Sequence, residues 1–261
     1  MQRYFIEVFY RGTHYAGFQI QQNANSIQAE VEKALHTFFR DHFQLTCSSR
    51  TDAGVHALSN FFHFDAGPGY SIIACSNDAL KKAVYNLNAI IPGDIVIRQI
   101  FKVDANAHCR FDATSRSYHY YIYQDKNPFL ADRSFFYPYK LDIALLQEAA
   151  DLLLAFTDFT SFSKKHTQVK SFNCRIMKSE WSRKQDSIVY HVEANRFLRG
   201  MVRGLVGTML KVGTGKILSR EFKEIIEAKD NARADFSVPA HGLFLSKVNF
   251  NPNKSGLPGT F

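Results

Sequence analysis

A carboxylate followed by two small residues lies in the middle of residues 49–56, which read SRTDAGVH. Alternating residues on either side predict one strand that ends at Ser48 and another that begins near Asn60, so Asp52 is expected on the turn between them. Gly54 suits the positive φ that such a turn requires. An ordinary surface turn explains the same residues, but an ionised carboxylate in this position could also act as a nucleophile or as a general base.

Other kinds of catalytic or binding site find no support in the sequence. Residues 213–216, GTGK, invite comparison with a phosphate-binding loop, but Ile217 stands where that pattern needs Ser or Thr, and the segment ends a helix. The histidines include no HExxH pattern, and the four cysteines lie far apart, so neither a metal site nor a disulfide framework is predicted. No GxSxG motif of a serine hydrolase occurs. We therefore expect no metal and no cofactor.

The composition is that of a folded chain with an anionic partner. Of the 261 residues, 46% are hydrophobic and 14% aromatic, which is too much apolar surface for a disordered chain. No apolar run approaches the roughly 18 residues that span a bilayer, and the first residues lack the apolar core of a signal peptide. Lys and Arg total 32 against 24 Asp and Glu, a net charge of +8, and many of these cations gather in residues 164–184. Nucleic acid is the first candidate partner, and a cytoplasmic location is expected.

Strand and helix patterns alternate in two similar halves. Hairpin strands broken by helices predict an α+β fold, in which each half has a mainly antiparallel sheet with helices on one face. We expect the halves at residues 1–105 and 106–250, followed by a tail at 251–261. The predicted strands are 3–9, 44–48, 60–64, 95–103, 117–123, 176–181, 187–194 and 242–250, and the predicted helices are 27–38, 77–89, 142–154, 195–212 and 220–228.

Several segments together resemble the TruA family of tRNA pseudouridine synthases, in family order and over almost the entire chain. The segments are residues 9–19 (FYRGTHYAGFQ), 26–28 (SIQ), 50–56 (RTDAGVH), 87–88 (LN), 91–95 (IPGDI), 110–120 (RFDATSRSYHY), 158–162 (DFTSF), 197–207 (FLRGMVRGLVG) and 242–243 (GL). Three residues depart from the usual pattern: Arg11 stands in place of Asp, Phe18 in place of Trp and Ser49 in place of Gly. None of the three removes a proposed catalytic group. Arg11 and Ser49 could change how RNA enters, which leaves the choice among positions 38, 39 and 40 open.

The resemblance implies an activity, a partner and an assembly. Such enzymes convert uridine to pseudouridine in the anticodon stem-loop of tRNA, at positions 38, 39 or 40, without metal or cofactor. They are homodimers that hold tRNA across a positively charged cleft between the halves. By the same resemblance, Asp52 is the catalytic aspartate, Tyr118 lies beside the target base and Arg203 pairs with Asp52.

The reaction is compatible with these residue types. It breaks the N1–C1′ bond, turns the uracil and rejoins it through C5, so no atoms are gained and no electrons enter. An ionised carboxylate is required to trap C1′ or to take a proton from C2′, and the sequence leaves both routes open. A planar guanidinium such as that of Arg203 holds a carboxylate bidentately. Tyr118 offers a ring for the uracil and a phenol that could relay the C5 proton, with Tyr120 on the same strand face as its rival.

Arginines are the expected RNA contacts. The target uridine must be flipped out at a cost of about a few kcal/mol, and Arg50, two residues before Asp52, is expected to fill the vacated space. The resemblance adds Arg110. Arg196 and Arg199, at the start of the predicted helix 195–212, are expected to meet phosphates or to form a solvated basic face.

Two other functional classes fit parts of the sequence. One is an RNA-binding protein that has lost catalysis, against which the intact Asp52, Tyr118 and Arg203 argue. The other is a nucleoside hydrolase that uses Asp52 and releases free uracil. The product distinguishes all three: pseudouridine, no product, or uracil.

Overall fold

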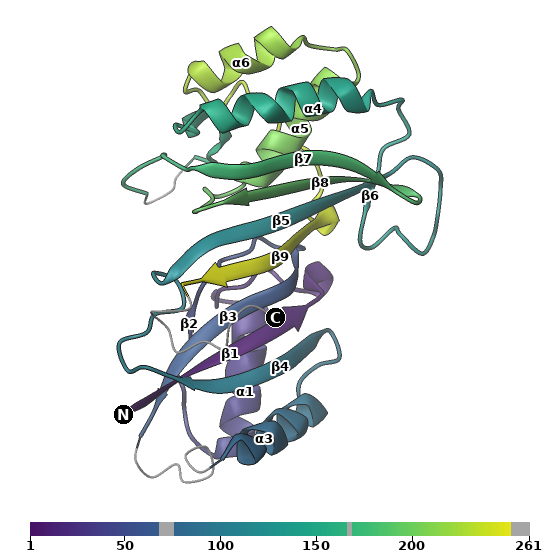
Figure 1. Ribbon diagram of the computed structural model, residues 1–261. Helices are drawn as coiled ribbons and strands as arrows, with labels where there is room; N and C mark the ends of the chain where they lie inside the picture. The colour runs from purple at the N-terminus through teal and green to yellow at the C-terminus, as the bar shows by residue number, and fades with distance from the viewer. Residues whose placement is uncertain (68–75, 166–168, 252–261) are drawn as a thin grey trace. The chain divides into compact units, whose positions relative to one another are not determined.

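The computed structural model describes residues 1–67, 76–165 and 169–251 (Figure 1). They form two compact units. The first consists of Met1–Thr114 together with Leu245–Phe261, of which residues 252–261 are not described, and the second is Ser115–Phe244. The first unit therefore combines the N-terminal part of the chain with its C-terminal residues. Of the predicted tail at 251–261, the structure describes only residue 251. The predicted α+β class is confirmed, because both units combine mainly antiparallel strands with helices.

The first unit contains the sheet β4-β1-β3-β9, in which β1 is antiparallel to both β3 and β4. Ser26 begins helix α1 by accepting a hydrogen bond from the backbone N–H of Ala29, as the predicted N-cap requires. Helix α3 packs against β4 and against α1. The elements are β1 (Gln2–Tyr10), α1 (Ile27–Phe39), β2 (Thr46–Cys47), which pairs with β3 (His56–Ala66), α3 (Asn77–Ile90), β4 (Ile95–Val103) and β9 (Leu243–Phe250).

The second unit contains the strand order β5-β8-β7. Helix α4 packs against β7 and, with α6, against the central helix α5 (Figure 1). Glycines in α5 permit close approach, since a Cβ on Gly204 would lie 2.7 Å from the ring of Phe236. The elements are β5 (Ala113–Tyr123), β6 (Phe135–Phe136), which pairs with β5, α4 (Ile143–Leu152), β7 (Ile176–Lys184), β8 (Ser187–Ala194), α5 (Met201–Gly213) and α6 (Ser219–Glu227).

The predicted helix 195–212 begins six residues late, at Met201. Gly200 precedes it with a φ of +74°, and Asn195 uses its side-chain oxygen to accept from the backbone N–H groups of Arg175 and Arg196. The first residues of this segment are therefore bonded to other parts of the unit, and only its end, at Leu198 and Gly200, accepts hydrogen bonds from α5. The prediction that Arg196 and Arg199 lie at the start of the helix is wrong, because both residues precede it.

Several strand bounds also differ from the prediction: β5 begins at Ala113 and not at residue 117, and β7 ends at Lys184 and not at residue 181. The strand expected at 44–48 is reduced to the two residues of β2, and β3 begins at His56 and not near residue 60. Of the helices that the structure describes, none is both long and apolar enough to cross a membrane.

Candidate active site

Asp52 lies on a tight turn between β2 and β3. Its backbone carbonyl accepts a hydrogen bond from the N–H of Val55 at 3.2 Å, and Gly54 has a φ of +78°. The predicted turn and the positive φ of Gly54 are thus confirmed. Asp52 is half-buried, Thr51 before it is buried, and Arg50 is exposed. The turn holds a carboxylate at the surface on a backbone that is itself anchored in the core.

A buried polar network supports the residues that lead into the turn. Asn60 on β3 is fully buried, and its side-chain amide donates to the carbonyl of Ser49 at 2.9 Å and to the hydroxyl of Tyr10 at 3.1 Å. The hydroxyl of Ser48 donates to the amide oxygen of Asn60, and the hydroxyls of Tyr10 and Thr51 lie 2.8 Å apart. Because buried polar groups are costly to leave unpaired, this network fixes the backbone of residues 48–51.

The segment around Gly17 holds the turn from another side. Phe18 donates its backbone N–H to the carbonyl of Thr51 at 3.1 Å. Gly17 has a φ of +110°, and a Cβ there would lie 3.1 Å from that same carbonyl. The ring of Phe18 is fully buried and stacks on Phe62 at 4.7 Å. The residue that replaces the usual Trp therefore serves as a core anchor for this segment.

Gly12 fixes the end of the turn. Its N–H donates to Nδ1 of His56 at 3.1 Å, and a Cβ on Gly12 would overlap the carbonyl oxygen of Val55. Only a residue without a side chain fits at this approach. Sequence reasoning identified the turn but not these supports, because Tyr10, Gly12 and Gly17 lie about 40 residues before it.

The unusual Arg11 has a partner within the first unit. Its guanidinium lies 2.8 Å from one carboxylate oxygen of Asp94, and Nδ1 of His14 lies 3.0 Å from the other. The hydrogen bond from His14, followed by that from Arg11, lowers the pKa of Asp94 despite its partial burial. Asp94 belongs to the segment IPGDI at the start of β4. The arginine that replaces the usual Asp at residue 11 therefore forms an ion pair with a second segment that carries the family resemblance.

Arg50 and Arg110 lie close to the same thiol. Burial raises the pKa of Cys47, and the nearby guanidinium groups of Arg50 and Arg110 offset part of this effect. Both arginines are exposed. The guanidinium of Arg110 lies 5.8 Å from the ring centroid of Phe111, whose side chain is 74% exposed. The structure thus brings two of the predicted RNA-contacting arginines together beside an exposed aromatic ring.

One cluster has the residue types of a metal site. Among the residues that the structure describes, His63, His108 and Cys109 offer donor atoms within 4.8 Å of one another. Nδ1 of His63 accepts from the backbone N–H of Cys109 at 3.3 Å, and the Cys109 thiol donates to the carbonyl of Thr46 at 3.1 Å. Burial, and after it the charge of Arg3, lowers the pKa of His63 to about 4. These hydrogen bonds and the nearby guanidinium favour a structural role over cation binding.

Tyr118 and Tyr120 have different environments. Tyr120 is fully buried and donates its hydroxyl to the carbonyl of Pro239 at 2.7 Å, and burial raises its pKa strongly. Tyr118 retains 8% exposure, and its ring meets that of Phe197 edge-on at 5.0 Å. The hydroxyl of Tyr120 is therefore committed to the core, which leaves Tyr118 as the candidate of the two.

Arg203 is oriented by backbone carbonyls. It is half-buried on the first turn of α5, with Nε donating to the carbonyl of Val238 at 2.8 Å and Nη2 to that of Phe236 at 3.3 Å. Arg199 is exposed just before Gly200. Because Asp52 belongs to the first unit and the other predicted catalytic residues to the second, their grouping stays a prediction.

Comparison with known proteins covers most of the chain. Residues 8–112 and 149–251 match the family described as tRNA pseudouridine synthase. Proteins named tRNA pseudouridine synthase A are similar: that of Porphyromonas gingivalis is 44% identical over 251 residues, covering 95% of this chain and 97% of its own length. That of Bacteroides fragilis is 43% identical, covering 96% and 97%, and that of Staphylococcus carnosus 35%, covering 97% and 92%. With the Asp52 turn in its expected place and agreement along nearly the whole length, the chain belongs to the tRNA pseudouridine synthase family.

Proposed function

We propose that this chain, an isomerase by its family, converts uridine to pseudouridine in the anticodon stem-loop of tRNA, at position 38, 39 or 40. The observation that supports this most directly is the Asp52 turn. It presents a carboxylate on a backbone that is held by the buried network around Asn60 and by the segment around Gly17. A catalytic group needs this kind of fixed geometry, because loosening by about 1 Å costs about 10²-fold in rate.

In the proposed mechanism, Asp52 is the only group that attacks or deprotonates the ribose. The ionised carboxylate either bonds to C1′ or removes a proton from C2′ as the N1–C1′ bond breaks, and the freed uracil then turns. When C5 bonds to C1′, the bond between the carboxylate and C1′ breaks in the first route, and the proton returns to C2′ in the second. Tyr118 lies against the base and relays the proton that leaves C5. Arg203 pairs with Asp52 and aims it, a role that fits a guanidinium already oriented by the carbonyls of Val238 and Phe236.

The proposed RNA contacts are arginines. Arg50 occupies the space that the flipped uridine leaves, which is consistent with its exposure two residues from Asp52. Arg110 and Arg199 meet phosphates, and the net charge of +8 assists the approach of the RNA. We propose further that the enzyme acts in the cytoplasm as a homodimer.

Tritium release from unmodified tRNA labelled at uracil C5 tests the proposal, because C5 loses its hydrogen when it bonds to C1′. We expect wild-type protein to release tritium and Asp52→Asn to release none while still binding tRNA. Asp78→Asn is the matched control, since the Asp78 side chain on α3 is 91% exposed. Mapping the product to the anticodon arm would identify the position.

Two results would contradict the proposal. Free uracil in place of pseudouridine would indicate a hydrolase. Tight, salt-sensitive tRNA binding without any tritium release would indicate an RNA-binding protein.

A further inference from the structure

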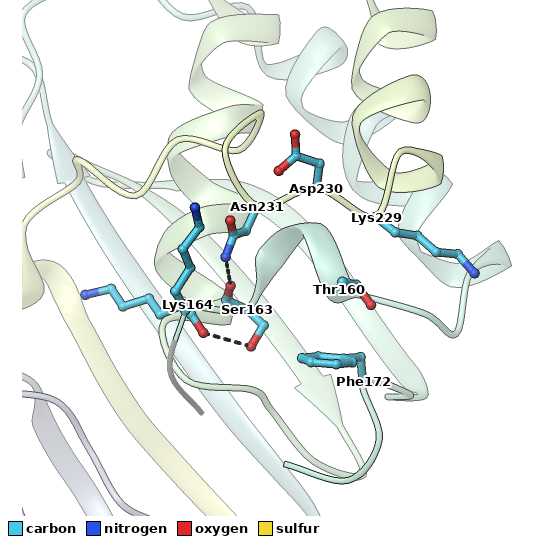
Figure 2. Close-up of a pocket in the computed structure, with 8 residues that line it drawn as sticks. Thr160, Ser163, Lys164, Phe172, Lys229, Asp230 and Asn231 are labelled. Carbon is cyan, nitrogen blue, oxygen red and sulfur yellow. Dashed lines mark hydrogen bonds between the residues drawn. The ribbon is translucent and has the colours of Figure 1, made fainter. Parts of the chain in front are cut away.

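A pocket of about 280 Å³ lies within the second unit (Figure 2). It is formed by the 3-10 turn Thr160–Phe162, the residues that follow this turn, and the loop after α6. Its lining combines three lysines with two hydroxyl groups, one aromatic ring, the amide of Asn231 and the carboxylate of Asp230, so cations outnumber the anion. Neither the resemblance nor the proposed mechanism gives these side chains a function.

The aromatic side of the pocket is fixed by backbone pairing. Phe159 donates its N–H to the carbonyl of Phe172 at 3.2 Å, and Cys174 donates to the carbonyl of Thr157 at 2.8 Å. An antiparallel bridge joins Asp158 to Asn173 between these two bonds. The half-buried Phe172 ring is thereby held near Thr160, with one face toward the pocket (Figure 2).

The opposite side is fixed by a buried hydroxyl. Ser161 is fully buried, donates to the carbonyl of Ile225 at 2.6 Å and accepts from the N–H of Asp230 at 3.0 Å. Asn231 donates its side-chain amide to the carbonyl of Ser163 at 2.9 Å (Figure 2). These bonds connect the loop after α6 to the 3-10 turn, so the pocket is formed without a ligand.

The lysines of the pocket differ in their pairing. Lys229 forms an ion pair with Asp158 at 2.9 Å. Among the residues that the structure describes, Lys164 and Lys165 form no ion pair. Lys164 is held by its backbone N–H, which donates to the carbonyl of Arg199 at 3.0 Å, and by its stem, which packs on Gly200. Two ammonium groups thus remain available for an anion directly beside the segment that carries Arg199.

We propose that this pocket binds one unpaired nucleotide of the substrate RNA, other than the reacting uridine. The phosphate is bound by Lys164 and Lys165, and the base stacks on Phe172. A lysine binds phosphate as a point charge, and every base has a face that stacks on an aromatic ring. A volume of about 280 Å³ accommodates one nucleotide but no duplex. The inference rests on the proposed function in one respect, the identity of the RNA.

Filter binding of tRNA over a range of salt concentrations tests both parts separately. Lys164→Met with Lys165→Met keeps the apolar stems. It is expected to weaken binding about five- to tenfold and to reduce the slope of log K against log salt by about 0.7 to 0.9, the value for one phosphate. Phe172→Leu is expected to weaken binding about 5- to 100-fold with an unchanged slope, because stacking involves no counterion release. Phe172→Tyr keeps the ring and is expected to bind as wild type does.

Lys81→Met with Lys82→Met is the matched control for charge. Both are exposed, adjacent lysines on α3 of the first unit, outside the basic run 164–184. We expect tRNA affinity within twofold of wild type. The proposal is overturned if Lys164→Met with Lys165→Met binds no more weakly than this control, or if Phe172→Leu binds as tightly as Phe172→Tyr.

The source of the phosphate and the proposed function are tested independently. Uridine 5′-monophosphate is expected to bind only at millimolar concentration. The assignment to RNA would be overturned if this nucleotide bound at micromolar concentration through the two lysines while their loss left the affinity for tRNA unchanged. Binding is measured without turnover. A wild-type protein that makes no pseudouridine but shows these binding differences would contradict the proposed function alone.

Discussion

The hydroxyl of Tyr10, at the end of β1, lies 2.8 Å from that of Thr51, the residue before Asp52, and also accepts a hydrogen bond from Asn60. A strand that contributes no residue to the motif 50–56 therefore holds the residue that precedes the carboxylate. The position of Asp52 therefore depends on the register in which β1 pairs with β3 as well as on the turn itself.

Tyr10→Phe is predicted to impair catalysis more than substrate binding. The change removes the hydroxyl partner of the buried Thr51 and one of the two hydrogen bonds that the Asn60 amide donates, so the free energy of unfolding should fall by about 1 to 3 kcal/mol. We expect kcat to fall at least tenfold with a nearly unchanged KM for tRNA. Tritium release and urea unfolding measure the two effects, and Tyr85→Phe, at a ring that is 76% exposed, is the control. A wild-type kcat in Tyr10→Phe would show that the network does not position Asp52.

Gly12→Ala is predicted to destabilise the protein severely. The new methyl group would overlap the carbonyl of Val55, so the backbone of the turn must shift, at a cost of about 3 kcal/mol or more. Gly93→Ala meets no atom within 4 Å and should change the free energy of unfolding by less than about 0.5 kcal/mol. Urea unfolding of both variants checks this difference, and equal stabilities would show that the turn tolerates displacement.

Tyr118 and Tyr120 on β5 are predicted to respond oppositely to loss of the hydroxyl. Tyr120→Phe removes the hydrogen bond to the carbonyl of the half-buried Pro239 and should lower the free energy of unfolding by about 1 kcal/mol, with turnover retained. Tyr118→Phe should lower kcat by about 10²-fold, the lower range for a proton relay, with little effect on stability. Thermal unfolding and tritium release on the same preparations separate the roles. Full activity in Tyr118→Phe would exclude the relay but not a contact with the base.

Stability is predicted to fall with acidification in two ranges. Burial, followed by the charge of His191, lowers the pKa of His119 to about 4. Burial, followed by the charge of Arg3, lowers the pKa of His63 to about 4 as well. The folded state therefore binds fewer protons than the unfolded state, in which histidine titrates near pH ~6.5. This stability is fully present above pH ~6.5 and is lost as the pH falls through about 4.

The second range belongs to carboxylates. The hydrogen bond from Arg3 lowers the pKa of Asp65, and the bonds from His14 and Arg11 lower that of Asp94, so their contributions are lost only below pH 3.8. Urea unfolding at pH 7, 5.5 and 4 measures the first range. His119→Phe removes a buried Nδ1 that has no hydrogen-bond partner among the residues that the structure describes, and this change should flatten the dependence of stability on pH in the first range. An unchanged slope in this variant would contradict the assignment.

Elements with local signals were predictable from the sequence. The side chain of Ser26 caps α1 as its position suggested, and β4 and β8 have the predicted bounds. The helix predicted over 195–212 is confirmed from Met201 onward, but its first six residues are not helical: Phe197 has helical spacing with Met201 but packs on Tyr118 instead. Hydrophobic spacing within a segment does not show whether a side chain will pack against a neighbouring strand and not along the helix.

The same distinction applies to the candidate sites. The Asp52 turn follows from its own residues, whereas the network beneath it joins residues 50 positions apart through the pairing of β1 with β3. Likewise, the lysines after residue 163 were recognised as a basic run. Their arrangement around Phe172 depends on the pairing of Asp158 with Asn173, which no sequence signal indicates.

Strand β9 has a consequence for the order of events during synthesis. It lies beside β3, and Phe250 contacts the rings of Phe61 at 5.1 Å and Phe5 at 5.8 Å. A nascent chain that has left the ribosome only as far as residue 242 lacks this strand, so the edge of β3 and two aromatic rings are open to chaperones. The sheet of the first unit can therefore be completed only after residues 243–250 have been synthesised. The Asp52 turn lies on this sheet, although its own residues are among the first to be made.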